Sequence, residues 1–460
     1  MRCAFLLLMT LAALGVDGCT GFTQDGGFDA VADAARQQRL ATRDIEWPRT
    51  PQERAKAGAE VAALLEGRPL SAEDAVQIAL LNNRMLQGAF EELGISEADL
   101  VQAGRLPNPR FDLRHASAAG QYDVEETLSL NVLSLLTMPY ARDIEKQRFA
   151  QTQRVAVLRV AQLAKDTREA YYAAVAAREA RGYLEQVRAA AETGATLAQR
   201  MVAAGNWNRL DQAREQNFYI DAVRSSTYAE LAETAAREKL IAVMGLPGEK
   251  SGVLSLQLAQ VLPTLPASVE NLPDIEGALL QDRLDLQLMR MRMDELQRRL
   301  KLTRSTRFVN VLEAGATRVQ QGSRDAPYER GYTITLEIPI LDSGSARVKR
   351  SEAIYAQAVD RFTQAAIEAR SQIRLAYANY HAAFELAKQQ RDEVLPLRKA
   401  VTEENLLRYN ASQISIFELL SGAAAQAAGF DGYIQRLRDF WIAKSQLDAA
   451  LLGNVGAVAP

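Results

Sequence analysis

Histidine and cysteine are scarce in this chain, which contains only two of each. His115 and His381 lie far apart in sequence, and we expect them in a strand and at a helix surface or interface, so a zinc-like cluster is excluded. Met289, Met291 and Met293 could bind a soft metal, but at helical spacing Met291 points away from the other two, which favours core packing. No phosphate-binding glycine loop or nucleophile motif occurs. We therefore expect neither catalysis nor a metal or other cofactor.

Long apolar runs and clustered basic charge are also missing. No run of about 18 apolar residues occurs after the N-terminus, so no transmembrane helix is expected. The composition is that of a globular protein, with 48% hydrophobic residues, 24% charged residues and a net charge of −3. This balance gives no electrostatic reason to expect nucleic acid as a partner.

The N-terminus carries the one long apolar segment. Arg2 precedes an apolar stretch over Ala4–Val16, and Gly18-Cys19 follows, which is the pattern of a secretory signal. The small residue before Cys19 predicts that this cysteine is the lipidated first residue of a bacterial lipoprotein. Asp17 is an unusual neighbour for such a site, and the alternative is a plain signal peptide with a chance cysteine. The processed chain would keep one cysteine and form no intrachain disulfide, and an acyl chain would anchor it to a membrane without crossing it.

The most informative pattern is a long internal repeat. Asn208 corresponds to Ser415 and Asp211 to Glu418, since 415 − 208 = 418 − 211 = 207. A repeat of this length indicates a duplicated half-protein rather than a short-period solenoid. It divides the chain into a signal peptide (1–18), an N-terminal extension (19–69), a first half (70–245), a linker (246–274), a second half (275–453) and a C-terminal tail (454–460). The unrepeated segments Asp29–Gly67 and Leu246–Asp274 are interpreted as linkers.

Each half is predicted to contain a first helix, two strands, a very long helix and a return helix. The long helices are rich in good helix formers, and only the second is interrupted, by Pro396, where we expect a kink. Asn208 and Ser415 have the features of helix N-caps, and Ser415 with Glu418 fits a capping box. The predicted helices are Ser71–Gln102, Ala141–Ala204 and Asn208–Met244 in the first half, and Ile275–Leu302, Ala346–Ala411 and Ser415–Leu452 in the second.

The strands are predicted from alternating polarity. Apolar and polar residues alternate around Phe111–His115, over Thr127–Val132 and over Tyr332–Ile340. Two hairpins give four strands, too few for a closed transmembrane barrel, and open edges in lipid are prohibitive. Two interpretations therefore stay open. Either several chains share one barrel, as three chains with twelve strands would, or a small soluble sheet caps a coiled coil.

The order of these elements and several short motifs resemble the TolC family of outer-membrane efflux proteins, over most of residues 70–453. The motifs are Leu80 with Asn83 and Leu86, Leu106-Pro107-Asn108-Pro109, Arg283-Leu284-Asp285-Leu286, Tyr332–Asp342 followed by Gly344, Arg408-Tyr409, and Leu451-Leu452-Gly453. The order and duplication of these motifs together are specific.

The resemblance implies a mainly α fold with a small β part. Long α-helical hairpins would form a periplasmic α-barrel, and four strands per chain would contribute to a shared trimeric 12-stranded transmembrane β-barrel. The function implied is that of a passive exit duct, lipid-anchored in the outer membrane and reaching into the periplasm. Its partners would be a periplasmic adaptor and an inner-membrane pump of the RND or ABC type. The alternatives are a duct for type I protein secretion and a non-pore periplasmic coiled-coil adaptor or spacer.

The resemblance also places the periplasmic tips near Gly205 and Ser412. The candidate gate residues are Gly205, Asp211, Arg408, Tyr409 and Glu418. In a trimer, acidic tip residues would form rings that attract cations. The alternative is that Asp211 and Glu418 only cap helices. Ser412 stands where the family has a tip glycine, and Ile414 where it often has a gate arginine.

Overall fold

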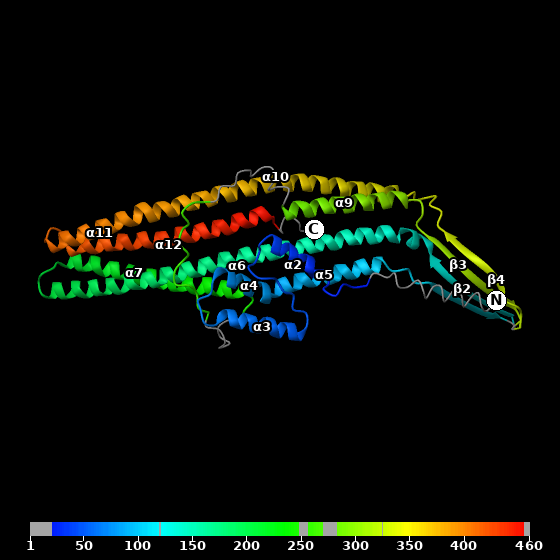
Figure 1. The fold of residues 1–460 in the computed structure, drawn as a ribbon, viewed down its shortest axis with the longest axis horizontal. Helices are drawn as coiled ribbons and strands as arrows, with labels where there is room; N and C mark the ends of the chain where they lie inside the picture. Colours follow the sequence, from blue (N-terminus) through cyan, green and yellow to red (C-terminus); the bar gives the residue numbers. More distant parts are fainter. Residues whose placement is uncertain (1–20, 119–120, 248–255, 270–282, 324, 455–460) are drawn as a thin grey trace. The chain divides into compact units, whose positions relative to one another are not determined.

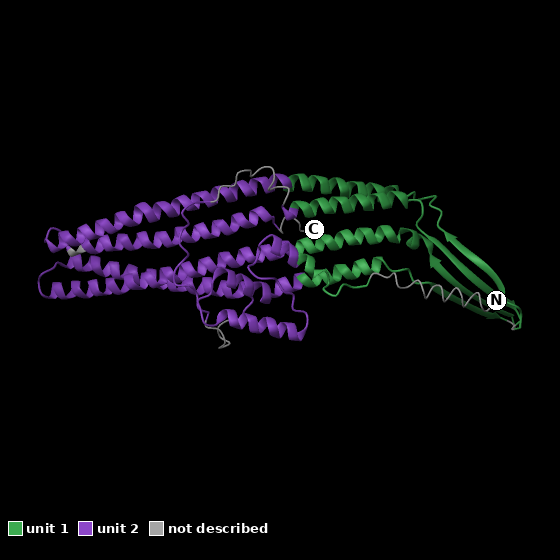
Figure 2. Ribbon diagram, in the orientation of Figure 1, with its two compact units in different colours: residues 1–31, 90–156, 286–365 green, residues 32–89, 157–285, 366–460 purple. Residues whose placement is uncertain are grey.

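The computed structural model describes residues 21–118, 121–247, 256–269, 283–323 and 325–454. The chain divides into two compact units, and each contains segments from both halves of the sequence (Figure 2). Unit 1 comprises Met1–Val31, Phe90–Ala156 and Leu286–Ala365, and unit 2 comprises Ala32–Ala89, Val157–Asp285 and Ala366–Pro460. The duplicated halves are therefore interleaved and are not separate spatial domains.

Helices dominate the described part of the chain (Figure 1). They are α2 (Phe28–Gln37), α3 (Pro51–Leu65), α4 (Ala72–Asn82), α5 (Arg84–Ala103), α6 (Val132–Ala203), α7 (Arg209–Val243), α9 (Leu284–Ser305), α10 (Ser345–Gln389), the π-helical turn η3 (Gln390–Val394), α11 (Leu395–Asn410) and α12 (Ile416–Leu452). The strands are β1 (Arg110–Ala118), β2 (Gln121–Asn131), β3 (Leu312–Gly322) and β4 (Glu329–Leu336). None of the helices within the described ranges is both long and apolar enough to cross a membrane.

The first predicted helix, Ser71–Gln102, is wrong as a single element, because the chain breaks between α4 and α5. At Asn83 the backbone is extended, and the Asn83 Oδ1 accepts hydrogen bonds from the amides of Met85 and Leu86. Asn83 thus ends one helix and caps the next. The predicted start at Ser71 is confirmed, since Ser71 and Asp74 form a capping box. In the second half, α9 ends at Ser305, and the predicted segment before Arg283 lies outside the described residues.

The first long helix begins earlier than predicted. Val132, expected in a strand, is the first residue of α6, because Asn131 Oδ1 accepts a hydrogen bond from the Ser134 amide and caps the helix. Pro139 therefore lies inside this 72-residue helix, in its first turns, and does not precede it.

The strand predicted over Tyr332–Ile340 is too long. Strand β4 ends at Leu336, and Ile338 and Ile340 lie beyond it. Pro339 lies between these two residues and has no backbone N–H, so it cannot continue the strand ladder.

The interruption predicted at Pro396 is confirmed. The π-helical turn η3 precedes α11, which has Pro396 near its start. Widening the turn accommodates a proline that lacks an N–H and whose ring would otherwise meet the carbonyl of Asp392, four residues earlier.

The four strands form one antiparallel sheet in the order β1-β2-β3-β4. The hairpin β1-β2 comes from the first half of the sequence and β3-β4 from the second. Strand β2 pairs with β3 over ten register positions, from Tyr122 opposite Gly322 to Asn131 opposite Glu313. The two hairpins are thereby joined into one sheet, which lies wholly in unit 1.

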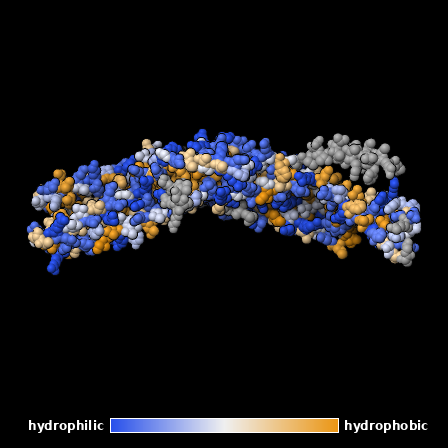
Figure 3. Space-filling model, turned by 90° about the horizontal axis from the view of Figure 1, so that it is seen from below, coloured by the Kyte–Doolittle hydropathy of each residue, from blue (hydrophilic) through white to orange (hydrophobic). Residues whose placement is uncertain are grey.

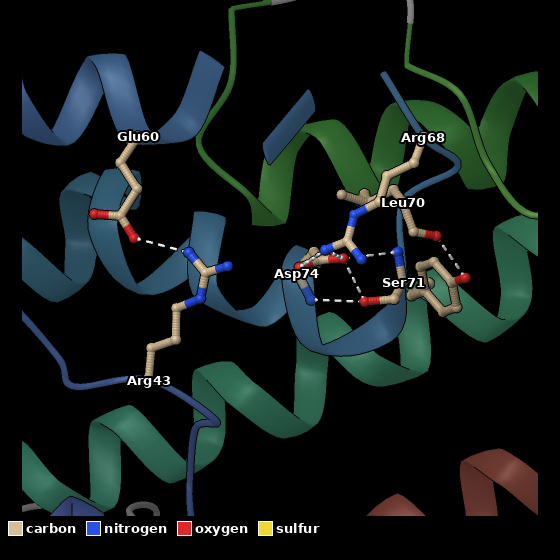
Figure 4. A network of polar contacts seen from close by, with 7 residues as sticks. Arg43, Glu60, Arg68, Leu70, Ser71 and Asp74 are labelled. Atoms are coloured by element: carbon tan, nitrogen blue, oxygen red, sulfur yellow. Dashed lines mark hydrogen bonds and ion pairs between the residues drawn. The ribbon is translucent and has the colours of Figure 1, made fainter. Parts of the chain in front are cut away.

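The N-terminal extension, interpreted as a linker, contains the helices α2 and α3. The residue that follows it, Leu70, is buried in unit 2. The Tyr171 hydroxyl on α6 donates to the Leu70 carbonyl at 2.8 Å, and Arg68 forms an ion pair with Asp74 (Figure 4). The Leu70 amide donates to the Gln257 carbonyl at 2.7 Å, which joins the start of the first half to the second unrepeated segment.

Candidate functional site

The sheet separates apolar from polar side chains. Register partners lie on the same face, so the paired positions form rows across the four strands. We call one face the apolar face; seven of its large apolar side chains are 45% to 82% exposed. These side chains are Phe111, Leu113, Leu128, Leu130, Tyr332, Ile334 and Leu336. A soluble sheet would bury such a face against other elements, so its exposure indicates a partner surface that the single chain does not supply.

The opposite face, called the polar face, carries hydroxyl and charged side chains. Thr127 and Thr317 hydrogen-bond across β2 and β3, with their hydroxyl oxygens 3.0 Å apart. Two arginines and five carboxylates lie on this face, which therefore has a net charge of −3 per chain. These residues are Arg110, Arg114, Asp112, Asp123, Glu125, Glu313 and Glu329.

Exposed apolar residues continue beyond the strands. After β4, Ile338, Ile340 and Leu341 are 70%, 82% and 101% exposed. At the start of α6, Leu136 and Tyr140 are also exposed. Figure 3 shows hydrophobic surface around the junction of helices and sheet in unit 1, at the right of the view. The apolar face is therefore part of a larger apolar zone that extends to the ends of the helices.

The first helical tip, between α6 and α7, is closed by local hydrogen bonds. Gly205 has a φ of +76°, and its amide donates to the Val202 carbonyl, while the Asn206 amide donates to the Met201 carbonyl. Asn208 caps α7, with its Oδ1 accepting from the Asp211 amide at 2.8 Å. The predicted cap is confirmed.

The second tip, between α11 and α12, repeats this geometry 207 residues later. Ser412 has a φ of +57°, and its amide donates to the Tyr409 carbonyl, while the Gln413 amide donates to the Arg408 carbonyl. Ser415 caps α12 in a capping box with Glu418, as predicted. Ser412 therefore adopts the left-handed conformation of its counterpart Gly205, although it has a side chain.

The candidate gate residues lie at these tips, where each makes contacts within its own hairpin. The Asp211 carboxylate accepts a hydrogen bond from the side-chain Nδ2 of Asn208 at 2.6 Å and pairs with Arg214 at 3.2 Å. Arg408 pairs with Glu404, one turn earlier on α11, at 2.8 Å. Tyr409 is 36% exposed in the last turn of that helix. The capping roles of Asp211 and Glu418 are seen directly, and their gating role stays a prediction.

Glu215 is a buried carboxyl near the first tip that belongs to none of the sequence motifs. Its side chain is 1% exposed on α7, and its Oε2 has no hydrogen-bond partner among the described residues. A Cβ added to Gly194 of α6 would lie 3.4 Å from this oxygen and 3.4 Å from Leu420 of α12. Burial and, less strongly, the charge of Asp211 raise the pKa of Glu215 above its usual range. The only advance signal was a glutamate at an inward helix position.

The remaining candidates are placed as follows. His115 lies on β1, as expected, and His381 lies on α10 with its ring 4.4 Å from that of Tyr377. Met289, Met291 and Met293 are half-buried on α9. Within the described ranges, no group of three or more His, Cys, Asp or Glu side chains could hold a metal. Cys19 lies outside the described residues.

No protein-family model and no curated protein matches this sequence. Solved structures do match, and one is CusC, whose structures concern folding and transmembrane channel formation. It gives a TM-score of 0.70 at 14% identity, covering 83% of this chain and 92% of CusC. The outer-membrane protein VceC of Vibrio cholerae gives 0.67 at 12% identity, covering 84% and 96%. The MtrE outer-membrane channel of Neisseria gonorrhoeae, in its open state, gives 0.66 at 16% identity, covering 84% and 89%.

These likenesses define the fold. The chain has the architecture of solved outer-membrane channels, and the predicted combination of long helical hairpins with four strands is confirmed. At 12% to 16% identity the likeness concerns the fold alone.

Proposed function

We propose that this chain is the protomer of a homotrimeric outer-membrane exit duct that serves a tripartite efflux system. The observation that carries the proposal is the open four-stranded sheet with an exposed apolar face. In lipid, unpaired strand edges are prohibitive, so such a sheet must close with other copies. Because four antiparallel strands place β1 and β4 in opposite directions, β4 of one copy can pair with β1 of the next in the same antiparallel sense. Three copies give twelve strands, an even number within the range of such barrels.

In this assembly the apolar face meets lipid and the polar face lines the lumen, as in other transmembrane barrels. The net charge of −3 per chain on the polar face would make the lumen attractive to cations. The helical hairpins would extend into the periplasm, and their tips around Asp211, Tyr409 and Glu418 would narrow the entrance. The duct is passive and has no catalytic step. A periplasmic adaptor and an inner-membrane pump, of RND or ABC type, would open the tips and deliver the cargo.

A matched pair of substitutions tests the orientation of the sheet. Ile334 on the apolar face and Thr333 on the polar face are neighbours on β4. Ile334→Arg should cost about 2–4 kcal/mol of insertion free energy if the residue lies near the bilayer midplane, whereas Thr333→Arg should cost little because it would face water. The measurement is the fraction of protein that needs detergent for extraction and runs as a trimer. Equal behaviour of the two variants, or release of wild-type monomer by salt alone, would instead support the non-pore periplasmic spacer.

Conductance distinguishes a duct from a trimer that never opens a pore. Purified trimer in a planar bilayer should show discrete channel openings with cation preference.

The proposal of a lipid anchor at Cys19 has a separate test, which is the mass of the N-terminal peptide of protein made in a bacterial host. An acylated cysteine is expected, and an unmodified mature N-terminus would mean that residues 1–18 are a plain signal peptide. A type I secretion duct would give the same results in both tests and differs in the pump that co-purifies.

A further inference from the structure

Two arginines face each other on the apolar face of the sheet. Arg318 of β3 and Arg330 of β4 are register partners. Side chains at directly opposite positions have Cβ atoms about 4.5–5.5 Å apart, and like charges there destabilise the pair. An anion held between the two guanidinium groups would turn this repulsion into attraction. Arginine suits this role because its planar fork of donors matches the oxygens of a phosphate.

One of the two arginines is already oriented. The Arg318 Nε donates a hydrogen bond to Glu126 on β2, its register partner on the other side, and the Arg318 guanidinium lies 4.6 Å from the centre of the Tyr328 ring. Arg330 is exposed and makes no ion pair or hydrogen bond through its side chain with any other residue the structure describes. Glu126, Arg318 and Arg330 together carry a net charge of +1, so one positive charge in this row is not balanced by the chain.

The position of the row selects the kind of anion. On the helix-proximal side of Arg318 and Arg330, the apolar face carries the row of Phe111, Leu128, Ala316 and Tyr332, followed by the residues of two further apolar rows. On the other side, the face carries His115, Val124 and Gln320, and then the hairpin turns. The arginine row therefore marks the border of the apolar zone on the side away from the helices. In a membrane, this border coincides with the headgroup level of the leaflet opposite the helices.

We propose that Arg318 and Arg330 form a binding site for the phosphate group of an anionic lipid headgroup, at the outer-leaflet border of the sheet. This inference rests on the proposed function, because it requires the apolar face to lie in lipid. Arg330 supplies the unbalanced charge, and Arg318, fixed by Glu126 and Tyr328, supplies further N–H donors. In the trimer the site recurs three times, and the lipid phosphates held there would relieve the repulsion between the paired arginines of each copy.

The test measures lipid binding to full-length trimer in neutral detergent. The probes are dihexanoyl phosphatidic acid, dihexanoyl phosphatidylcholine and inorganic phosphate, titrated at low salt and followed by native mass spectrometry. Wild-type protein should bind phosphatidic acid best, and Arg330→Gln should weaken this binding about tenfold, the effect of losing one charge-assisted hydrogen bond. The matched control is Arg114→Gln, an arginine of the same sheet on the polar face, which should leave the dissociation constant unchanged.

A second variant tests the charge balance in the opposite direction. Glu126→Gln removes the carboxylate that neutralises Arg318, so it should tighten binding of phosphatidic acid several-fold. Equal losses in Arg330→Gln and Arg114→Gln, equal binding of phosphatidylcholine, or weaker binding in Glu126→Gln would each overturn the proposal. Inorganic phosphate binding as tightly as phosphatidic acid would show a free-phosphate site and overturn the lipid assignment.

All variants are first checked for trimer formation and conductance. If wild-type protein forms no trimer and no channel, the proposed function fails. If the channel is intact and only the lipid preference is absent, the lipid site alone fails.

Discussion

Arg283 and Asp285 form a buried ion pair in unit 2, with the Arg283 Nη2 and an Asp285 carboxylate oxygen 2.6 Å apart. Their side chains are 1% and 3% exposed. Arg283 also donates hydrogen bonds to the carbonyl of Ala450, near the end of α12, and to the carbonyl of Ala369 on α10. The Asn454 amide donates to the other side of the pair, at Asp285. The pair therefore fastens the end of the last helix to the long helix of the second half, far from the tips in sequence.

Removing the arginine alone should be strongly destabilising. Arg283→Met removes the ion-pair partner of the buried Asp285 carboxylate, which should cost about 3–5 kcal/mol of unfolding free energy. The measurement is chemical unfolding of the detergent-solubilised protein. The matched control is Arg292→Met, an exposed arginine on α9, the helix that begins directly after Arg283, and it should change stability by less than about 0.5 kcal/mol.

The double variant Arg283→Met, Asp285→Leu separates charge from packing. Replacing both members of a buried pair by apolar residues is often neutral or stabilising, so most of the loss should be recovered. A double variant as unstable as the single one would show that the hydrogen bonds to Ala450 and Ala369 matter more than the uncompensated charge.

The sequence predicts features that depend on neighbouring residues, but not those that depend on contacts between distant segments. The caps at Asn208 and Ser415 were predictable because capping depends on neighbouring residues, and the strand faces because polarity alternates locally. The break at Asn83 was not predictable, because the side-chain Nδ2 of Asn83 donates to the Val243 carbonyl at 2.8 Å, 160 residues away. For the same reason the motif Arg283-Leu284-Asp285-Leu286 was visible in the sequence, but its contacts with Ala450 and Ala369 were not.

The two tips differ in the residue at their left-handed position, and this difference has a measurable effect. A residue other than glycine in this conformation costs roughly 1–2 kcal/mol, partly offset because glycine loses more entropy on folding. Ser412→Gly should therefore stabilise the second tip by up to about 1 kcal/mol, and Gly205→Ser should destabilise the first by a similar amount. Amide hydrogen exchange of residues beside each turn reports the local free energy of opening. Changes of the same sign in both variants would contradict the equivalence of the tips.

Asp211 is the acidic gate candidate of the first tip, and its carboxylate contacts the Asn208 side chain and Arg214 at the start of α7. Asp211→Ala, combined with Tyr409→Phe, should loosen the closed tips. A loss of about 1 kcal/mol would shift the ratio of open to closed channels about fivefold. Single-channel recording at low salt measures the shift as an increase in open probability or closed-state conductance.

The control for the gate is a matched ion pair away from the tip. Asp221 pairs with Arg224 on α7 at the same spacing of three residues as Asp211 with Arg214. Asp221→Ala removes one exposed carboxylate from the same helix and should leave the closed state unchanged. If the Asp211 and Tyr409 variants also leave it unchanged, these residues have no part in the gate and their role is limited to the local structure of the tip.

Glu215 predicts a pH dependence of the tip region. Burial, aided by Asp211, raises the pKa of Glu215, so the folded protein binds this proton more tightly than the unfolded chain, whose glutamates titrate near 4.5. The charged Glu215 carboxylate therefore destabilises the fold when the pH lies above its pKa in the folded protein. This destabilisation is lost as the pH falls below the pKa of the unfolded chain. Glu215→Gln should therefore raise the unfolding temperature at pH 7 and change it little below about pH 4.5. Glu238→Gln, at an exposed position of the same helix, should show no such difference between the two pH values. Equal effects of Glu215→Gln at both pH values would mean that the carboxyl is destabilising through its shape and not through its charge.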